Sequence, residues 1–329
     1  MNKEYEIRTG VIGVGSMGKN HVRIYSEISN LVAIADPDEE QGKLIAEKFG
    51  VEWFRDYESL LPHVDAVTIS VPTVYHKEVA RKCTEQGVHI LVEKPLADNV
   101  KNAESIINYA LANKVTLGVG HVERFNAVVE TARRNIKDGN WGEIFTITAR
   151  RFSNYPSRIH DVGVLFDLTI HDVDVICHLI SDKAISVYAL GGKSKNDFHE
   201  DHVSLLINFE QGQIGLCETN WLTPMKVRDL SLTTDKCYIN LDYLEQNINV
   251  FSSNYGKIDN SNLYKPPMEV KKNTISPESK EPLRCELEDF LSSIIQKKSP
   301  FVTGQDGLRA VKIVEAGLKS LNTGKVINL

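Results

Sequence analysis

The sequence has few cysteines, and they lie far apart. Its 329 residues include five of them, Cys83, Cys177, Cys217, Cys237 and Cys285, and no two form a C-x-x-C pair. An odd number of dispersed thiols argues against a disulfide framework and favours buried, reduced cysteines. We therefore expect a protein of a reducing compartment, the cytoplasm.

Long apolar runs are also missing. One of the longest uncharged apolar runs covers only residues 115–120, whereas a membrane helix needs roughly 20 such residues. The first six residues, MNKEYE, contain acids and no apolar segment, which is unlike a signal peptide. We expect neither a membrane span nor a membrane partner.

Basic residues are fewer than acidic residues. Lys and Arg number 38 against 44 Asp and Glu, a net charge of −6. This balance argues against a strongly basic face and a nucleic-acid partner, although a local basic pocket for a phosphorylated small molecule stays open. The length predicts about two domains.

A glycine-rich segment is the first functional signal. Residues 9–14 form a short apolar run typical of a buried parallel strand. In the G-x-G-x-x-G segment that follows, Gly13 permits a tight turn, Gly15 lets the backbone approach a pyrophosphate, and Gly18 lets the next helix pack closely. The candidate cofactor-binding residues of this segment are Gly13, Gly15, Ser16, Met17 and Gly18.

An acid follows at the expected distance. Asp36 ends the strand predicted over 31–36, 18 residues after Gly18, where a carboxylate binds the adenosine ribose hydroxyls. Further acids at 38–40 would repel a 2′-phosphate, so NAD is preferred over NADP. The alternative is that Asp36 merely caps the helix predicted over 38–49.

Strands and helices alternate through the first third. Strands are predicted over 65–71, 88–92 and 115–119, with helices over 76–86 and 99–113 between them. Such alternation predicts an α/β fold with a doubly wound parallel sheet, whose ligands bind beyond the carboxyl ends of the strands. We assign an NAD-binding Rossmann domain to 1–122. Further cofactor candidates near strand ends are Ser70, Pro72, Thr73, His76, Glu93 and Lys94.

The pattern changes after residue 122. Few helices separate the later β-type runs, so an open, mostly antiparallel sheet is expected in an α+β domain over 123–329. We assign this domain to substrate binding and oligomerisation, with the sheet's free face covered by a second copy. Its C-terminal helix could pack back on the first domain. Residues 252–282 are polar and predict a long loop or lid. The other expected elements are helices over 125–138, 281–297 and 304–322 and strands over 144–152, 184–190, 202–209, 214–221, 227–233 and 237–242.

Asp167 and His171 stand four residues apart on the apolar-periodic stretch 164–179. On a helix both point to one face, where the carboxylate fixes the imidazole tautomer for general base catalysis. A surface ion pair or a satisfied core histidine is the alternative. The nearby acids and histidines fit no compact zinc spacing, so we expect no metal; the set considered was His160, His171, Asp172, Asp174 and His178.

Together these segments resemble the Gfo/Idh/MocA oxidoreductase family. The likeness runs essentially end to end, and Glu93-Lys94-Pro95 joined to Asp167-x-x-x-His171 is its specific part. The resemblance implies that Lys94 and His171 flank the reacting hydroxyl and that Asp167 supports them. It also implies dimers or tetramers. Arg124, in the motif over 120–126, is a further cofactor candidate.

A narrower likeness is to the UDP-N-acetylglucosamine 3-dehydrogenase branch, carried by residues 120–126, 156–176 and 218–224. It implies NAD-dependent oxidation at C3 of the sugar. A nucleotide sugar brings a diphosphate, which arginines bind well; the substrate candidates are Lys94, Arg151, Tyr155, Arg158 and His171. The alternatives are a free sugar or inositol dehydrogenase and a non-catalytic, cofactor-sensing protein.

Overall fold

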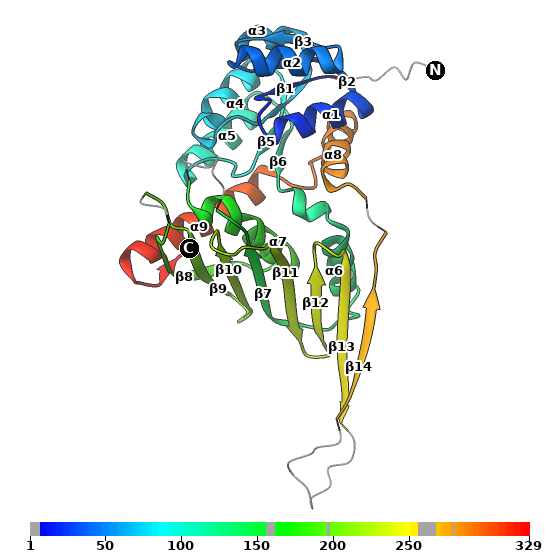
Figure 1. Ribbon diagram of the computed structural model, residues 1–329, viewed down its shortest axis with the longest axis vertical. Helices are drawn as coiled ribbons and strands as arrows, with labels where there is room; N and C mark the ends of the chain where they lie inside the picture. Colours follow the sequence, from blue (N-terminus) through cyan, green and yellow to red (C-terminus); the bar gives the residue numbers. More distant parts are fainter. Residues whose placement is uncertain (1–6, 156–161, 196–197, 256–267, 279) are drawn as a thin grey trace, which may run out of the picture. The chain divides into compact units, whose positions relative to one another are not determined.

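The computed structural model describes residues 7–155, 162–195, 198–255, 268–278 and 280–329. The chain divides into two compact units (Figure 1). The first unit comprises Met1–Phe125 and Glu281–Glu315, and the second comprises Asn126–Lys280 and Ala316–Leu329. Each unit is built around its own sheet.

The first unit contains a six-stranded sheet in the order β3-β2-β1-β4-β5-β6. Every neighbouring pair runs parallel, so the predicted doubly wound parallel sheet is confirmed. The order reverses between β1 and β4, where ligands bind in such folds. The strands are β1 (Arg8–Ile12), β2 (Asn30–Ala35), β3 (Glu52–Phe54), β4 (Ala66–Ile69), β5 (His89–Glu93) and β6 (Leu117–Gly120).

Helices connect these strands, and their ends follow local chemistry. Asp38 caps α2 by accepting a hydrogen bond from the Gln41 backbone N–H, and Gly50 ends it with a left-handed backbone, φ 68°, which glycine adopts without strain. The helices of the first unit are α1 (Gly18–Ile28), α2 (Glu39–Phe49), α3 (Tyr57–Leu60), α4 (His76–Glu85), α5 (Val100–Ala112) and α8 (Pro282–Gln296), with short 3₁₀ turns η1 (Leu61–His63), η2 (Thr73–Tyr75) and η3 (Val122–Phe125). Helix α9 (Gly304–Thr323) begins in the first unit and ends in the second.

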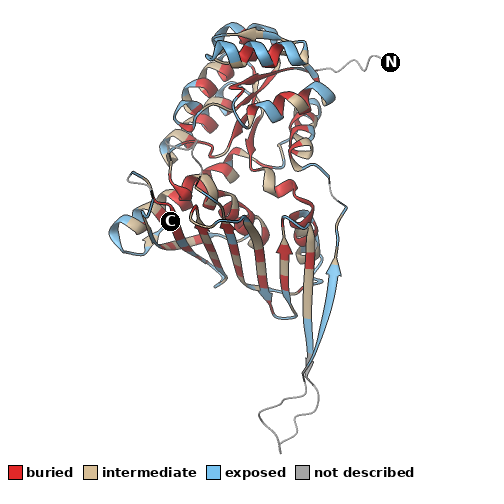
Figure 2. Cartoon of the chain, in the orientation of Figure 1, coloured by how far each residue is buried: buried red, intermediate tan, exposed pale blue. Residues whose placement is uncertain are grey.

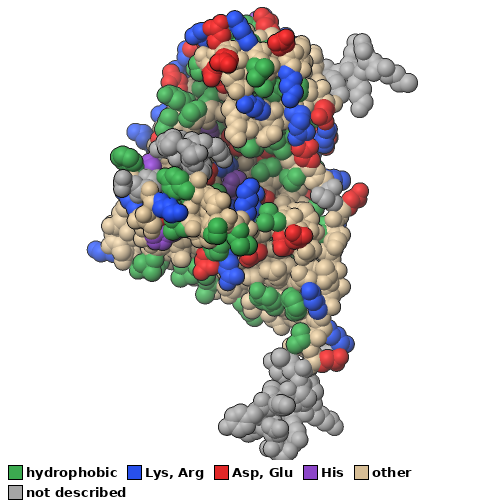
Figure 3. Space-filling view, in the orientation of Figure 1, with side chains coloured by type: hydrophobic (Ala, Val, Ile, Leu, Met, Phe, Trp, Pro, Cys, Tyr) green, Lys and Arg blue, Asp and Glu red, His purple; other side chains and the backbone are tan. Residues whose placement is uncertain are grey.

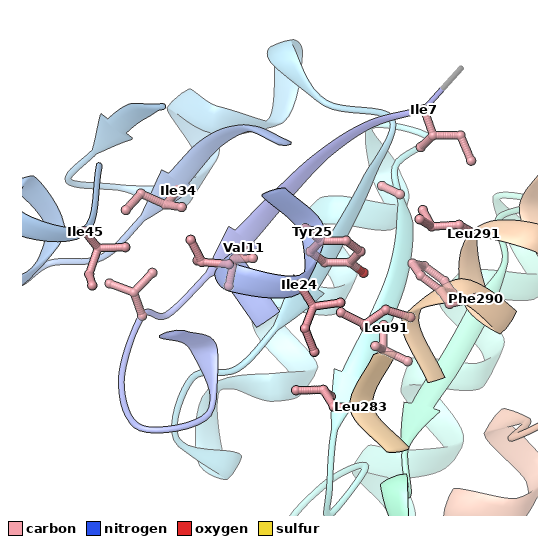
Figure 4. Packing of buried hydrophobic residues seen from close by; sticks show 14 of the residues in the cluster. Ile7, Val11, Ile24, Tyr25, Ile34, Ile45, Leu91, Leu283, Phe290 and Leu291 are labelled. Atoms are coloured by element: carbon pink, nitrogen blue, oxygen red, sulfur yellow. The ribbon is translucent and has the colours of Figure 1, made fainter. Parts of the chain in front are cut away.

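The core of the first unit lies between α1, α8 and the sheet (Figure 4). Tyr25 of α1 and Phe290 of α8 are almost fully buried there, beside Leu91 of β5. The buried strands and exposed outer helix faces are visible in Figure 2. A segment from near the C-terminus therefore completes the core of the N-terminal fold.

The second unit contains a nine-stranded sheet in the order β14-β13-β12-β11-β7-β10-β9-β8-β15. Only β7 and β10 pair in parallel; the other pairings are antiparallel, as predicted. Along β9, buried and exposed residues alternate strictly, so one face is covered and one is open. The elements of this unit are α6 (Ala127–Lys137), β7 (Ile144–Phe152), a π-helical turn η4 (Leu165–Thr169), α7 (Ile170–Ile180), β8 (Ala184–Gly192), β9 (His202–Phe209), β10 (Ile214–Asn220), β11 (Val227–Thr234), β12 (Tyr238–Asp242), β13 (Asn247–Tyr255), β14 (Met268–Ile275) and β15 (Ile327–Asn328).

The prediction of a long loop over 252–282 was wrong where β13 and β14 lie. These strands pair antiparallel from Ile248↔Ile275 to Tyr255↔Met268 and extend as a two-stranded ribbon (Figure 1). Their polar residues gave no apolar alternation, yet backbone pairing needs none.

Charged side chains of both signs are interspersed over the visible surface of the first unit (Figure 3). Within the described residues, no helix combines the length and the apolar character that crossing a membrane requires.

Candidate functional site

The glycine loop between β1 and α1 has the geometry of a phosphate-binding turn. Gly13 has a φ of +85°, and a Cβ there would lie 2.6 Å from the Ser70 carbonyl oxygen. A Cβ on Gly18 would lie 1.9 Å from the Gly13 carbonyl oxygen. Gly15 instead faces open space, with nothing within 4 Å of its Cβ position. The loop is thus tightly closed on one side and open to a pyrophosphate on the other, as a dinucleotide requires.

Asp36 is tied to this loop. Its Oδ2 accepts a hydrogen bond of 2.8 Å from the Val14 N–H, and its Oδ1 accepts one of 2.9 Å from the Asp38 N–H. The N-cap of α2 is Asp38 rather than Asp36. A carboxylate offers about four acceptor positions, so Asp36 keeps capacity for ribose hydroxyls while it holds the loop.

The loops that follow β4 and β5 are joined by His76. Its ring nitrogens each lie 3.0 Å from a carbonyl oxygen, that of Val71 and that of Pro95. Burial lowers the pKa of His76 despite these two contacts. Of the other cofactor candidates in this segment, Thr73 is buried, Ser70 is half-buried and Pro72 is exposed. His76 therefore holds the loop after β4 to the loop after β5. Ser70 and Pro72, which are more accessible, remain candidates for contact with the cofactor.

Lys94 directly follows β5 and is half-buried, and its peptide bond to Pro95 is cis. The preceding Glu93 is buried; its Oε2 accepts from the Lys94 N–H at 3.1 Å, and its Oε1 lies 2.7 Å from Nε2 of His21. Burial opposes ionisation of Glu93, but His21 and Lys94 lower its pKa below the ordinary value. His21 belongs to α1, so this pair connects the helix after the glycine loop to the segment that carries Lys94.

Arg124, a predicted cofactor residue, is buried in the first unit. Its guanidinium lies 3.1 Å from Oδ1 of Asp306, at the start of α9. Burial opposes ionisation of Asp306, but Arg124 and hydrogen bonds from Thr303 hold the pKa of that carboxyl well below its usual range. This ion pair joins η3, at the end of β6, to α9.

Asp167 and His171 lie in the second unit on consecutive elements. Asp167 is in the π-helical turn η4, and His171 is in the first turn of α7; both side chains are partly exposed. The apolar spacing predicted one continuous helix, whereas the structure changes from π to α at Ile170. Single π turns of this kind are frequent at functional sites.

A buried carboxylate holds the beginning of this π turn. Oε1 of Glu200 accepts from the Leu165 N–H at 3.1 Å, and a Cβ on Gly163 would lie 2.1 Å from the same oxygen. Burial raises the pKa of Glu200. The glycine at 163 therefore leaves the space that Glu200 fills.

The arginines of β7 lie on opposite faces of the sheet. Arg151 is 3% exposed and binds Asp172 of α7 through both Nε and Nη2, at 3.0 and 2.9 Å. Arg150 is exposed and pairs with Glu218 of β10 at 3.0 Å. Arg151 thus joins α7 to the sheet. Direct binding of a substrate phosphate by Arg151 would require its ion pair with Asp172 to break. Tyr155 stacks edge-on against Trp221 at 5.8 Å, and Arg158 lies outside the described residues.

The site residues thus form two groups, one in each unit. The first combines the open glycine loop, Asp36 and Lys94, which all follow the carboxyl ends of strands in the parallel sheet. The second combines Asp167 of η4 with His171 of α7, the helix that the buried Arg151–Asp172 pair joins to β7. His21, Glu200 and Asp172 complete these groups but carried no sequence signal, because their partners are 72, 35 and 21 residues away.

Comparison with protein families gives two matches. A family described as an oxidoreductase family with an NAD-binding Rossmann fold matches residues 7–121. The GFO/IDH/MocA C-terminal domain matches residues 129–239. The first match covers all six strands of the parallel sheet, and the second covers strands β7 to β11 of the nine-stranded sheet.

Individual relatives are similar over almost the whole chain. UDP-N-acetylglucosamine 3-dehydrogenase of Acidithiobacillus ferrooxidans is 27% identical over 93% of this chain and 94% of the relative. Scyllo-inositol 2-dehydrogenase (NAD(+)) of Bacillus subtilis is 26% identical over 99% of this chain and 97% of the relative. A solved structure of the Acidithiobacillus enzyme is 26% identical, covers 96% of this chain and 97% of its own, and has a TM-score of 0.87.

Proposed function

This chain belongs to the Gfo/Idh/MocA family of NAD-binding oxidoreductases that act on CH–OH groups, and we propose that it oxidises the C3 hydroxyl of UDP-N-acetylglucosamine. The product is the 3-keto nucleotide sugar. The observation that carries the proposal is the likeness to a UDP-N-acetylglucosamine 3-dehydrogenase in both sequence and fold over more than nine-tenths of the chain.

NAD is the proposed cofactor, with NADP disfavoured. The acids at and after Asp36 repel a 2′-phosphate, and Asp36 itself is positioned beside the glycine loop by Val14. Bound NAD supplies the hydride acceptor. Its proposed contacts are the loop glycines with Ser16 and Met17, the segment from Ser70 to His76, and Lys94. Glu93 is proposed to act indirectly, by holding His21 and the backbone of Lys94. Arg124 is proposed to act indirectly through its ion pair with Asp306.

The proposed chemistry of the protein is proton transfer and charge stabilisation. His171 takes the proton of the C3 hydroxyl, and Asp167 keeps the imidazole in the required tautomer. The Lys94 ammonium stabilises the developing alkoxide. Tyr155 and Arg158 are proposed substrate contacts, and Arg151 contributes by holding α7 through Asp172.

A homodimer or homotetramer is proposed through the open face of the second sheet. Leu206 of β9, Ile214 of β10 and Tyr238 of β12 are large apolar side chains that are exposed on this sheet, and a second copy would remove them from water. Light scattering of the purified protein tests this: Leu206→Glu should lower the mass of the wild-type oligomer, and an unchanged mass would contradict the assignment.

A substrate panel tests the reaction. We expect NADH formation with UDP-N-acetylglucosamine, and deuterium in the product NADH when the sugar is deuterated at C3. An inositol or free-sugar dehydrogenase is the second candidate because the inositol dehydrogenase is almost equally similar; faster turnover of myo-inositol, scyllo-inositol or glucose would favour it. NAD binding without turnover of any of them would indicate a cofactor-sensing protein.

A further inference from the structure

A pocket lies in the first unit where strands β5 and β6 begin, at the end of the parallel sheet opposite to the glycine loop. It is lined where β5 begins at His89 and β6 begins at Leu117, whereas the glycine loop follows the carboxyl end of β1. Because all these strands run parallel, the pocket and the dinucleotide loop are at opposite ends. Its volume is about 670 Å³, within the range of small-molecule sites.

The pocket combines an apolar interior with a cationic rim. Ile107 and Ala110 of α5 and Leu117 of β6 are buried where they line it. Lys114, Lys297 and Lys298 also line it and are exposed, and the lining contains no Asp or Glu. A ligand with an apolar body and an anionic head group matches this arrangement of apolar and cationic side chains.

The pocket also contains uncharged hydrogen-bond donors that could bind an anion. Nδ1 of His89 accepts the Thr116 N–H at 2.8 Å, so the neutral imidazole carries its proton on Nε2 and can donate. Burial lowers the pKa of His89, which favours this neutral form. The hydroxyls of Ser299 and Thr303 lie in the same lining.

The backbone at the rim is unusual. The helices that end at the pocket, α5 and α8, are followed by lysines with left-handed backbone, Lys114 at φ 56° and Lys297 at φ 53°. Other helices of the unit use glycine for this purpose, as at Gly50 and Gly87. A lysine adopts this conformation less readily than glycine does, and both of these lysines line the same pocket.

The walls are fixed by main-chain pairing. The segment between α8 and α9 is joined to β6 by a hydrogen bond of 3.3 Å from the Val119 N–H to the Val302 carbonyl and by a bridge between Gly118 and Thr303. The cavity is therefore formed before any ligand binds, which limits the ordering that binding requires.

We propose that this pocket binds a small amphipathic carboxylate, with its apolar part against Ile107, Ala110 and Leu117 and its carboxylate among the three lysines. This site is separate from the proposed cofactor and substrate contacts and does not depend on the proposed reaction.

Calorimetric titration with octanoate, and with octanol as a neutral match, tests the proposal. We expect octanoate to bind in the millimolar range or tighter, equally with and without saturating NAD, and octanol to bind about tenfold more weakly. Absence of octanoate binding, equal affinity for octanol, or competition with NAD would each overturn the proposal.

Variants locate the site. Lys114→Gln, Lys297→Gln and Lys298→Gln together should weaken octanoate at least about tenfold, and so should Leu111→Asp, which puts a negative charge on an exposed lining position. The control is a triple variant that replaces three exposed lysines elsewhere in the unit by glutamine, Lys48, Lys101 and Lys312. It changes the net charge by the same amount and should leave octanoate binding unchanged. Equal weakening by both triple variants would refute the assignment to this pocket.

Discussion

Glu93 is buried between two functional segments and binds both of them. One carboxylate oxygen contacts His21 of α1, and the other accepts the backbone N–H of Lys94. The helix behind the phosphate loop is thereby linked to the lysine that we assign to catalysis. Nothing in the sequence indicated this role for His21, because a contact across 72 residues leaves no local pattern.

We predict that His21→Ala destabilises the fold by roughly 3 kcal/mol, because it leaves the buried Glu93 carboxylate without its imidazole partner. His21→Gln, whose amide can reach the same oxygen, should recover part of the loss. Urea denaturation measures both, with the exposed Lys19→Ala on the same helix as the control. Equal stability of His21→Ala and Lys19→Ala would show that the pair is not structural.

The elements themselves were largely predictable, and the failures have physical causes. The strand over Ile144–Phe152 was predicted with its observed bounds because it is rich in β-branched and aromatic residues. The ribbon of β13 and β14 was missed because its residues are polar and its order comes from backbone pairing. The π turn at Leu165–Thr169 was missed because an apolar stretch does not reveal which carbonyl each N–H will bind.

One prediction concerns the attachment of α7 to β7. Asp172→Asn removes the carboxylate charge that the buried Arg151 binds through Nε and Nη2, so we expect a loss of about 3–5 kcal/mol in the free energy of unfolding. Arg150→Gln, in the exposed pair on the adjacent residue, should cost less than about 1 kcal/mol.

The double variant Arg151→Met/Asp172→Leu separates this structural role from substrate binding. It removes both charges and should recover much of the stability lost in Asp172→Asn. A structural role predicts a changed kcat with little change in KM for the nucleotide sugar. A KM raised more than tenfold with unchanged kcat would instead mean that Arg151 binds the diphosphate directly.

The ion pair of Arg124 and Asp306 predicts a pH dependence. The pKa of Asp306 is lower in the fold than in the unfolded chain, so the unfolded state binds more protons as pH falls. Its stabilisation is complete above the unfolded pKa of about 3.9 and is lost as pH falls below that value.

Asp306→Asn should therefore be less stable than wild type at pH 7 and should lose less stability between pH 5 and pH 3. Urea denaturation at several pH values measures this, with the exposed Glu104→Gln of α5 as the control. Identical pH profiles for Asp306→Asn and wild type would contradict a stabilising role for the pair.

At the scale of the whole molecule, the sequence order and the folded units differ in one respect. Residues 281–315 fold with the N-terminal sheet, although they follow the second sheet along the chain. The sequence predicted a helix over 281–297 but not the core that it joins; in the structure Leu287 and Phe290 of α8 pack into the core of the first unit. The candidate site residues were predictable where a motif carries them, as at Gly13 and Lys94, whereas the residues that hold them in place were not.

The central claim is that Lys94 and His171 act on the same substrate hydroxyl. Turnover of UDP-N-acetylglucosamine by Lys94→Ala and by His171→Ala, measured together with NAD affinity, tests it most directly. We predict that each variant loses at least about 10²-fold in kcat while NAD binding stays within a few fold of wild type. Wild-type turnover in either variant would contradict the role assigned to that residue.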